Sequence, residues 1–159
     1  MIEFKKILVP VDFSNYSRNA IKFSVEFAIK NNAHILMLYV IEPIIYPADL
    51  SIGQIALPSV NLDLDQTAKS ELEKLAQSEI GDAVQTTCII KYGKPFLEII
   101  ETARDEDADL IIISSHGRSG VEHILFGSTA DKVVRKSPCP VLTIREPLKG
   151  FNYKDVYHG

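Results

Sequence analysis

Glycine and hydroxyl residues gather between Ser114 and Thr129, and this segment is the first candidate for chemistry. Its last glycine, Gly127, precedes a predicted helix that begins at about Ser128. The amides of Ser128, Thr129 and Ala130 should therefore lack intrahelical acceptors and carry a partial positive charge, which suits a phosphate or another anion. The same residues also fit a plain loop in which Ser128 caps the helix. The chain contains neither G-x-x-x-x-G-K-[S/T] nor G-x-G-x-x-G.

A carboxylate is the second candidate. Asp12 stands between a predicted strand that ends at Val11 and a predicted helix that begins at Ser14 or Asn15. Either Asp12 or Ser14 caps that helix, or Asp12 faces a ligand at the rim of the sheet.

Two histidines, His116 and His123, flank the glycine-rich segment. Neither has an identifiable nucleophile, second base or orienting carboxylate beside it, so both are expected to be exposed loop histidines. We assign no catalytic residue.

The elements that must position these residues alternate along the chain. Short runs rich in Ile, Val and Leu predict strands over residues 6–11, 34–41, 84–92, 110–114 and 141–145. Helical periodicity falls between them, at about 15–31, 64–80, 95–105 and 128–136. This alternation indicates an α/β fold, an open doubly wound parallel sheet with helices on both faces, in which ligands bind at the carboxyl ends of the strands.

Two helix faces can be assigned. In the first helix, the expected buried stripe consists of Ala20, Phe23, Phe27 and Ala28, widened by Ile21 and Val25. In the second helix, the residues expected to face inward are Ala68, Leu72, Leu75 and Ala76. Residues 42–61 contain three prolines among apolar side chains, which predicts a packed loop or a lid over a cleft.

The spacing of the glycines carries a resemblance to a known family. Gly117, the nine residues 118–126 and then Gly127-Ser128 resemble the nucleotide signature of the universal stress protein family, G-x2-G-x9-G-[S/T], with Ser114 in place of its first glycine. The opening KILVPVDFS and the closing SPCPVLTI resemble the family as well, so the likeness covers residues 1 to 146.

The resemblance implies a Rossmann-like five-stranded sheet of order 3-2-1-4-5. It also implies an adenine pocket walled by Pro10, Val11 and Val40, with Asp12 near the ribose or a phosphate-bound cation. The remaining ligand contacts that it implies are Ile113, Ser114 and Gly117 beside the sugar and first phosphates, and Gly127, Ser128, Thr129 and Ala130 around the other phosphates. The side chain of Ser114 either crowds the ligand or donates a hydrogen bond to it.

Composition limits the alternatives. The chain has 159 residues, 46% hydrophobic and 24% charged, and a net charge of −4. One globular domain over 1–146 with a tail over 147–159 is expected, and broad nucleic-acid binding is disfavoured. No apolar run is long enough to span a membrane, and no secretion signal is recognisable, so a cytoplasmic location is expected. Cys88 and Cys139 are expected to be buried thiols rather than metal ligands or a disulfide.

These observations favour a cytoplasmic protein that binds ATP or AMP, with or without Mg²⁺, and acts as a regulatory module toward an unidentified protein partner. At most, slow ATP hydrolysis is expected. The alternative is a dimeric scaffold that binds no nucleotide, as some members of the family lack the signature. An enzyme with an adenylated intermediate is a third hypothesis without identifiable catalytic residues. A homodimer through the edge strand at 141–145 is expected in the first two cases.

Overall fold

The computed structural model describes residues 2–43, 59–116 and 126–145. Most of the loop or lid expected over 42–61 lies outside the described residues. So do Gly117, His123 and the tail over 147–159.

Strands and helices alternate through the described chain. The order is β1 (Lys6–Val11), α1 (Asn15–Asn31), β2 (His34–Ile41), α2 (Ser59–Glu79), β3 (Thr86–Tyr92), α3 (Pro95–Asp105), β4 (Leu110–Ser114), α4 (Ser128–Lys136) and β5 (Val141–Ile144). All strand pairs are parallel, and the sheet order is β3-β2-β1-β4-β5. The predicted fold class and strand order are confirmed.

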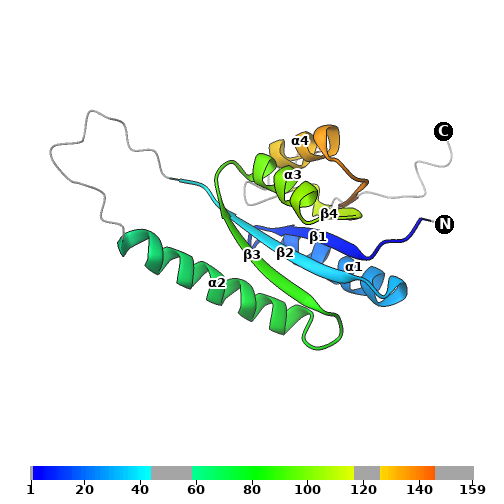
Figure 1. Cartoon of the computed structure of the whole chain (residues 1–159), viewed down its shortest axis with the longest axis horizontal. Helices are drawn as coiled ribbons and strands as arrows, with labels where there is room; N and C mark the ends of the chain where they lie inside the picture. Colours follow the sequence, from blue (N-terminus) through cyan, green and yellow to red (C-terminus); the bar gives the residue numbers. More distant parts are fainter. Residues whose placement is uncertain (1, 44–58, 117–125, 146–159) are drawn as a thin grey trace, which may run out of the picture.

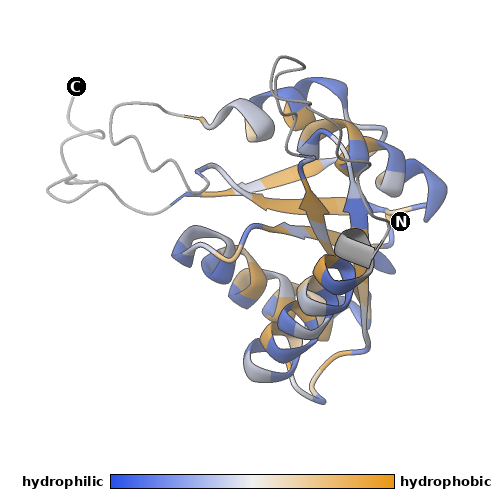
Figure 2. Ribbon diagram, turned by 90° about the vertical axis from the view of Figure 1, so that its left-hand side faces the viewer, coloured by the Kyte–Doolittle hydropathy of each residue, from blue (hydrophilic) through white to orange (hydrophobic). Residues whose placement is uncertain are grey.

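Two helix layers cover the sheet, as Figure 1 shows, with α1 and α2 on one face and α3 and α4 on the other. Side chains of β1 alternate between the two layers: Ile7 and Val9 pack with α1 and α2, whereas Leu8 packs with α3 and α4. Burial on both faces explains why the central strands are continuously apolar. Figure 2 shows these hydrophobic strands between helices whose outward surfaces are largely hydrophilic.

The predicted buried face of α1 is confirmed at Ala20, Ile21 and Ala28 but is wrong at Phe23. Phe23 is 55% exposed, whereas Ser17 and Ser24 are buried beside Ala20 and Ala28. The two serine hydroxyls donate to main-chain carbonyls within the same stretch of chain, Ser17 Oγ to Ser14 and Ser24 Oγ to Ile21. A serine satisfied in this way can replace an apolar residue on a buried face, and a pattern of apolar residues alone misses it.

The second helix begins at Ser59 rather than near Leu64, so it takes in residues 59–61 that were expected to be irregular. Among the side chains described from Asp63 onward, the first buried one is Leu72, and Leu64 is 53% exposed. Apolar periodicity records the turns that pack against the sheet, so a helix that continues past its contacts is underestimated. No helix among the described residues is long and apolar enough to cross a membrane.

A proline opens the sheet beside β1. In the ladder between β1 and β4, the amide of Asp109 donates to the carbonyl of Lys6, and the paired residues end at Leu8 and Ile111. Every second residue of β1 faces β4, so after Leu8 the next amide that could donate to β4 would be at position 10. This residue is Pro10, which has no N–H. On its other side β1 stays paired with β2 as far as Val11. The carboxyl ends of β1 and β4 are therefore not paired beyond Leu8 and Ile111.

Candidate functional site

A cavity of about 470 Å³ lies at this opening, between the carboxyl ends of β1, β2 and β4 and the start of α4. Its volume is within the range of small-molecule and cofactor sites. Every predicted binding residue that the structure describes lines it: Pro10, Val11, Asp12, Val40, Ile113, Ser114, Gly127, Ser128, Thr129 and Ala130.

Other lining residues were not predicted. They are Ser17, Leu38, Tyr39, Ile41, Glu42, Pro95, Ile99, Ser115 and His116. Side-chain alternation along β2 was the available signal, because Leu38 and Val40 share the face that packs with α3 and thus reach Ile99. The sequence does not show how closely the start of α3, with Pro95, approaches that face.

The start of α4 offers uncapped amides to the cavity. Gly127 is the N-cap residue, with φ −64° and ψ 154°, and no side chain caps the helix. Ser128 is therefore the first helical residue rather than the cap. Among the described residues, no hydrogen-bond acceptor is found for the amides of Ser128, Thr129 and Ala130. Such amides form an anion site.

A hydrogen bond from the preceding strand holds this helix start in place. The amide of Gly127 donates to the carbonyl of Ser115 at 2.7 Å, and the amide of Ser115 donates to the carbonyl of Ile144 at 2.9 Å. The N-terminus of α4 is thus tied to the ends of β4 and β5. The uncapped amides therefore belong to a helix start that is hydrogen-bonded to the ends of two strands.

The hydroxyl of Ser114 is already engaged. Ser114 ends β4, is 8% exposed, and donates from Oγ to the carbonyl of His116 at 2.7 Å. Its φ is not positive, since the described non-glycine residues with positive φ are Phe13, Asn32 and Asp107. Serine therefore fits the backbone where the family signature has glycine. Its single hydroxyl proton closes the turn and, in this arrangement, is not available to a ligand.

Asp12 belongs both to the cavity and to the start of α1. Its Oδ1 accepts hydrogen bonds from the amide of Ser14, at 3.0 Å, and from the Ser14 hydroxyl. Ser14 is the N-cap and accepts from the amide of Ser17 at 3.2 Å. The helix is thus capped by Ser14, and Asp12 orients the cap while it lines the cavity.

His116 is half-buried rather than exposed. Its Nδ1 lies 3.0 Å from Ser115 Oγ, and its ring packs on Tyr16 of α1 with centroids 5.6 Å apart. The ring therefore forms a wall of the cavity. Cys88 and Cys139, expected to be buried, are also only partly buried.

The described lining carries negative side-chain charge. Asp12 and Glu42 are its carboxylates, and it includes no lysine or arginine. Two nearby cations are engaged elsewhere: Lys132 Nζ lies 4.8 Å from the centroid of the Phe96 ring, and Arg135 pairs with Asp131 at 3.0 Å. No group of three or more potential metal ligands occurs among the described residues. Among the described residues, the favourable interaction with an anion therefore comes from the amides of α4.

Known proteins match this chain over most of its length. The sequence profile described as the universal stress protein family matches residues 3–145. Universal stress protein MJ0577 of Methanocaldococcus jannaschii is 30% identical over 156 residues, which span 91% of this chain and 96% of that protein. Its solved structure superimposes with a TM-score of 0.77 at 31% identity, covering 92% of this chain and 99% of that one.

Two solved structures at lower identity share the fold and contain ligands. One is a universal stress protein in complex with cAMP, 20% identical with a TM-score of 0.64, covering 90% of this chain and 98% of that one. The other is the universal stress protein of Archaeoglobus fulgidus in complex with dAMP, 19% identical with a TM-score of 0.60, covering 91% of this chain and 99% of that one.

Proposed function

This chain belongs to the universal stress protein family, and we propose that it binds ATP or AMP in the cavity between β1 and β4 and acts as a nucleotide-dependent regulatory module. The uncapped amides at the start of α4, at one end of a cavity with apolar walls from three strands, are the observation that carries this proposal. The complexes of more distant relatives with cAMP and dAMP support an adenine nucleotide as the ligand.

The apolar part of the cavity suits a purine base. Pro10, Val11, Leu38, Val40 and Ile113 line it from three neighbouring strands. A flat base buries its faces against such side chains, while main-chain groups at the end of β2 reach its polar edge. No aromatic stacking partner is required.

The polar part suits phosphates. The amides of Ser128, Thr129 and Ala130 and the hydroxyls of Ser128 and Thr129 surround the end of the cavity next to Gly127. Phosphate oxygens accept such hydrogen bonds and interact favourably with the positive end of the helix dipole.

Asp12 and Glu42 favour a divalent cation together with the phosphates. Two carboxylates on the lining repel a free triphosphate, whereas Mg²⁺ is held by phosphate oxygens and needs only one or two carboxylates from a protein. Asp12 is the residue that would hold the cation, and the cation would neutralise phosphate charge. Metal-free ATP should therefore bind more weakly than Mg·ATP, while AMP should depend less on Mg²⁺.

Regulation rather than rapid catalysis fits the lining. His116, the histidine on the described lining, is engaged with Ser115 and packs on Tyr16, which does not favour a role as the base that activates water. Binding would stabilise the fold in proportion to nucleotide concentration. We further propose that the protein works in the cytoplasm and passes this state to a protein partner.

Calorimetric titration of the purified chain with ATP, AMP and cAMP, with and without Mg²⁺, tests the proposal. Gly127→Val is the diagnostic variant, because φ −64° and ψ 154° at this position are accessible to valine, so the fold should be retained while the side chain enters the phosphate end. ATP affinity should fall at least about tenfold.

Absence of binding heat for all three nucleotides in a folded wild-type chain would contradict the proposal and favour the nucleotide-free scaffold. An unchanged affinity in folded Gly127→Val would place the nucleotide elsewhere. Release of phosphate from ATP at a rate of about one per second would instead indicate an enzyme.

A further inference from the structure

The main-chain hydrogen bonds of β3 show which of its residues face the sheet. The amide of Ile35 donates to the carbonyl of Gln85, and the amide of Gly93 donates to the carbonyl of Ile41. Both bonds join β3 to β2, its only strand neighbour among the described residues. In a parallel ladder, every second residue forms these bonds, so the odd-numbered residues between these two bonds face β2.

The even-numbered residues of β3 consequently point their main-chain groups away from the sheet. Thr86, Cys88 and Ile90 each present an N–H and a C=O at this edge, and no described residue pairs with them. An open row of this kind is a template for another extended chain.

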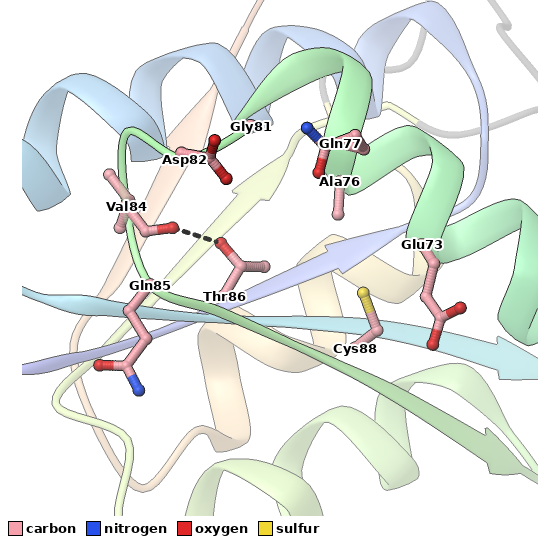
Figure 3. Close-up of a pocket in the computed structure, with 9 residues that line it drawn as sticks. All are labelled: Glu73, Ala76, Gln77, Gly81, Asp82, Val84, Gln85, Thr86 and Cys88. Atoms are coloured by element: carbon pink, nitrogen blue, oxygen red, sulfur yellow. Dashed lines mark hydrogen bonds between the residues drawn. The ribbon is translucent and has the colours of Figure 1, made fainter.

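A cavity of about 590 Å³ adjoins the edge and is distinct from the nucleotide site. It lies at the amino end of β3, whereas the proposed nucleotide site lies at the carboxyl ends of β1, β2 and β4. Figure 3 shows it between the second half of α2 and the start of β3, lined by Glu73, Ala76, Gln77, Gly81, Asp82, Val84, Gln85, Thr86 and Cys88.

A strand paired with β3 would place side chains in this cavity. Figure 3 shows the side chains of Thr86 and Cys88 on the side of β3 that faces α2. Alternate side chains of an added strand project to that same face, next to these two residues. The Thr86 hydroxyl already donates to the carbonyl of Val84 at 3.1 Å, so it does not select the incoming side chain.

The charge of the residues that line the cavity determines which side chain of an added strand fits there. Glu73 and Asp82 are exposed and stand at opposite ends of the cavity in Figure 3, and the lining includes no lysine, arginine or histidine. Burial raises the pKa of the Cys88 thiol, so the thiol stays neutral at pH 7. A basic side chain fits these walls. A second copy paired across a two-fold axis would bring the same carboxylates together, which disfavours self-association here.

We propose that the edge of β3 binds an extended segment of a partner protein and that this segment places a lysine or arginine side chain in the cavity between α2 and β3. Main-chain hydrogen bonds to Thr86, Cys88 and Ile90 hold the segment, and Glu73 and Asp82 provide specificity. This surface would be the contact through which a partner is recognised, independently of the nucleotide site.

Display of random peptides of about nine residues against the full chain tests the proposal. Enriched peptides should combine residues of high strand propensity with at least one lysine or arginine. In NMR spectra of the labelled protein, an enriched peptide should shift the amide resonances of Thr86, Cys88 and Ile90 more than those of β5.

Matched variants separate edge pairing from general attraction. Cys88→Pro removes one outward N–H and leaves the ladder with β2 intact, so peptide affinity should fall at least about tenfold, whereas Cys88→Ala should stay within about twofold. Glu73→Lys should weaken binding about tenfold, while Glu71→Lys, the same charge change at an exposed position of α2 outside the cavity, should have little effect.

Several outcomes would overturn the proposal. These are the absence of any enriched peptide, enrichment without basic residues, equal effects of Glu73→Lys and Glu71→Lys, and amide shifts confined to other strands. Pairing of β3 with a second copy would also overturn it. The NMR map on the wild-type chain decides the matter even where Cys88→Pro fails to fold.

Discussion

At position 114 a single hydroxyl group closes a turn where the family signature has glycine. The hydroxyl of Ser114 donates to the carbonyl of His116, and Ser114 is only 8% exposed. Loss of this hydroxyl therefore leaves the carbonyl of His116 without that hydrogen-bond donor. Ser114→Ala should lower the free energy of unfolding by about 1 kcal/mol and the Tm by about 3 °C.

Thermal unfolding followed by circular dichroism measures this effect. Ser70→Ala, at an exposed position of α2, is the matched control and should not lower the Tm. A Ser114→Ala variant as stable as the wild type would mean that the turn is held by other contacts.

The carboxylate of Asp12 offers a second prediction at the residue scale. Asp12→Asn keeps an oxygen that can accept from Ser14, so α1 should remain capped, but it removes the negative charge from the cavity. We expect the dependence of ATP affinity on Mg²⁺, about tenfold in the wild type, to fall to within about twofold.

Glu42→Gln is the control for this charge effect, because Glu42 lines the same cavity but is exposed. Calorimetry at several Mg²⁺ concentrations compares the two variants. Should Glu42→Gln lose the Mg²⁺ dependence and Asp12→Asn keep it, the cation would be assigned to the wrong carboxylate.

Candidate site residues could be predicted where their position relative to a neighbouring strand or helix can be recognised in the sequence. Gly127 and Ser128 follow from a glycine before a helix, and Asp12 from a carboxylate between a strand and a helix. The engagement of Ser114 with the carbonyl of His116 could not be predicted, because it depends on the direction that the chain takes after β4. The burial of Ser17 and Ser24 in α1 was missed for another reason. Their hydroxyls donate to carbonyls three residues earlier in the chain, and a pattern of apolar residues does not record such bonds.

At the scale of elements, Pro10 separates two strands that the topology places side by side. The amide of Ile111 bonds to β5, so the main-chain groups of Ile112 face β1, and a residue with an N–H at position 10 could donate to the carbonyl of Ile112 and extend the ladder between β1 and β4. Pro10→Val should therefore narrow the cavity and weaken ATP binding at least about tenfold while it keeps an apolar wall.

Stability should change little in Pro10→Val. One added hydrogen bond contributes about 1 kcal/mol, and the loss of proline's restriction of the unfolded chain costs about 0.4–1 kcal/mol. Hydrogen exchange of the amide at position 10 reports the new bond directly. An unprotected amide with wild-type ATP affinity would show that other contacts keep β1 and β4 apart.

Which segments form strands and which form helices could be predicted, because buried strands and amphipathic helices leave clear patterns in the sequence. The exact ends of the helices and the register between strands could not be predicted from these patterns. The strands of the central sheet are apolar on both faces, and α3 starts at Pro95 as expected. None of the side chains described from Asp63 to Glu71 in α2 is buried, so this part of the helix carries little periodic signal and the start of the helix at Ser59 was missed. The consequence of Pro10 was missed because it needs the register between β1 and β4.

At the scale of the whole molecule, an open sheet of order 3-2-1-4-5 has two edges, and the described residues show strand partners on one side only of β3 and of β5. The two edges differ in chemistry. Carboxylates flank the cavity beside β3, whereas Leu142 of β5 is 39% exposed and has no acidic neighbour in its own strand. The sequence could indicate which strand is an edge once the order was known, but the cavity beside β3 required the packing of α2.

We propose that β5 pairs with its own copy. The carbonyls of Pro140 and Ile144 accept hydrogen bonds from the amides of Ile111 and Ser115 of β4. Every second residue of β5 therefore faces β4, and the main-chain groups of Thr143 face outward.

Thr143→Pro removes the outward N–H of residue 143 without disturbing the ladder to β4. The variant should be monomeric in sedimentation equilibrium under conditions in which the wild type is a dimer. Thr143→Ala retains the N–H and should remain dimeric. A monomeric wild type, or a dimeric Thr143→Pro variant, would exclude pairing through this edge.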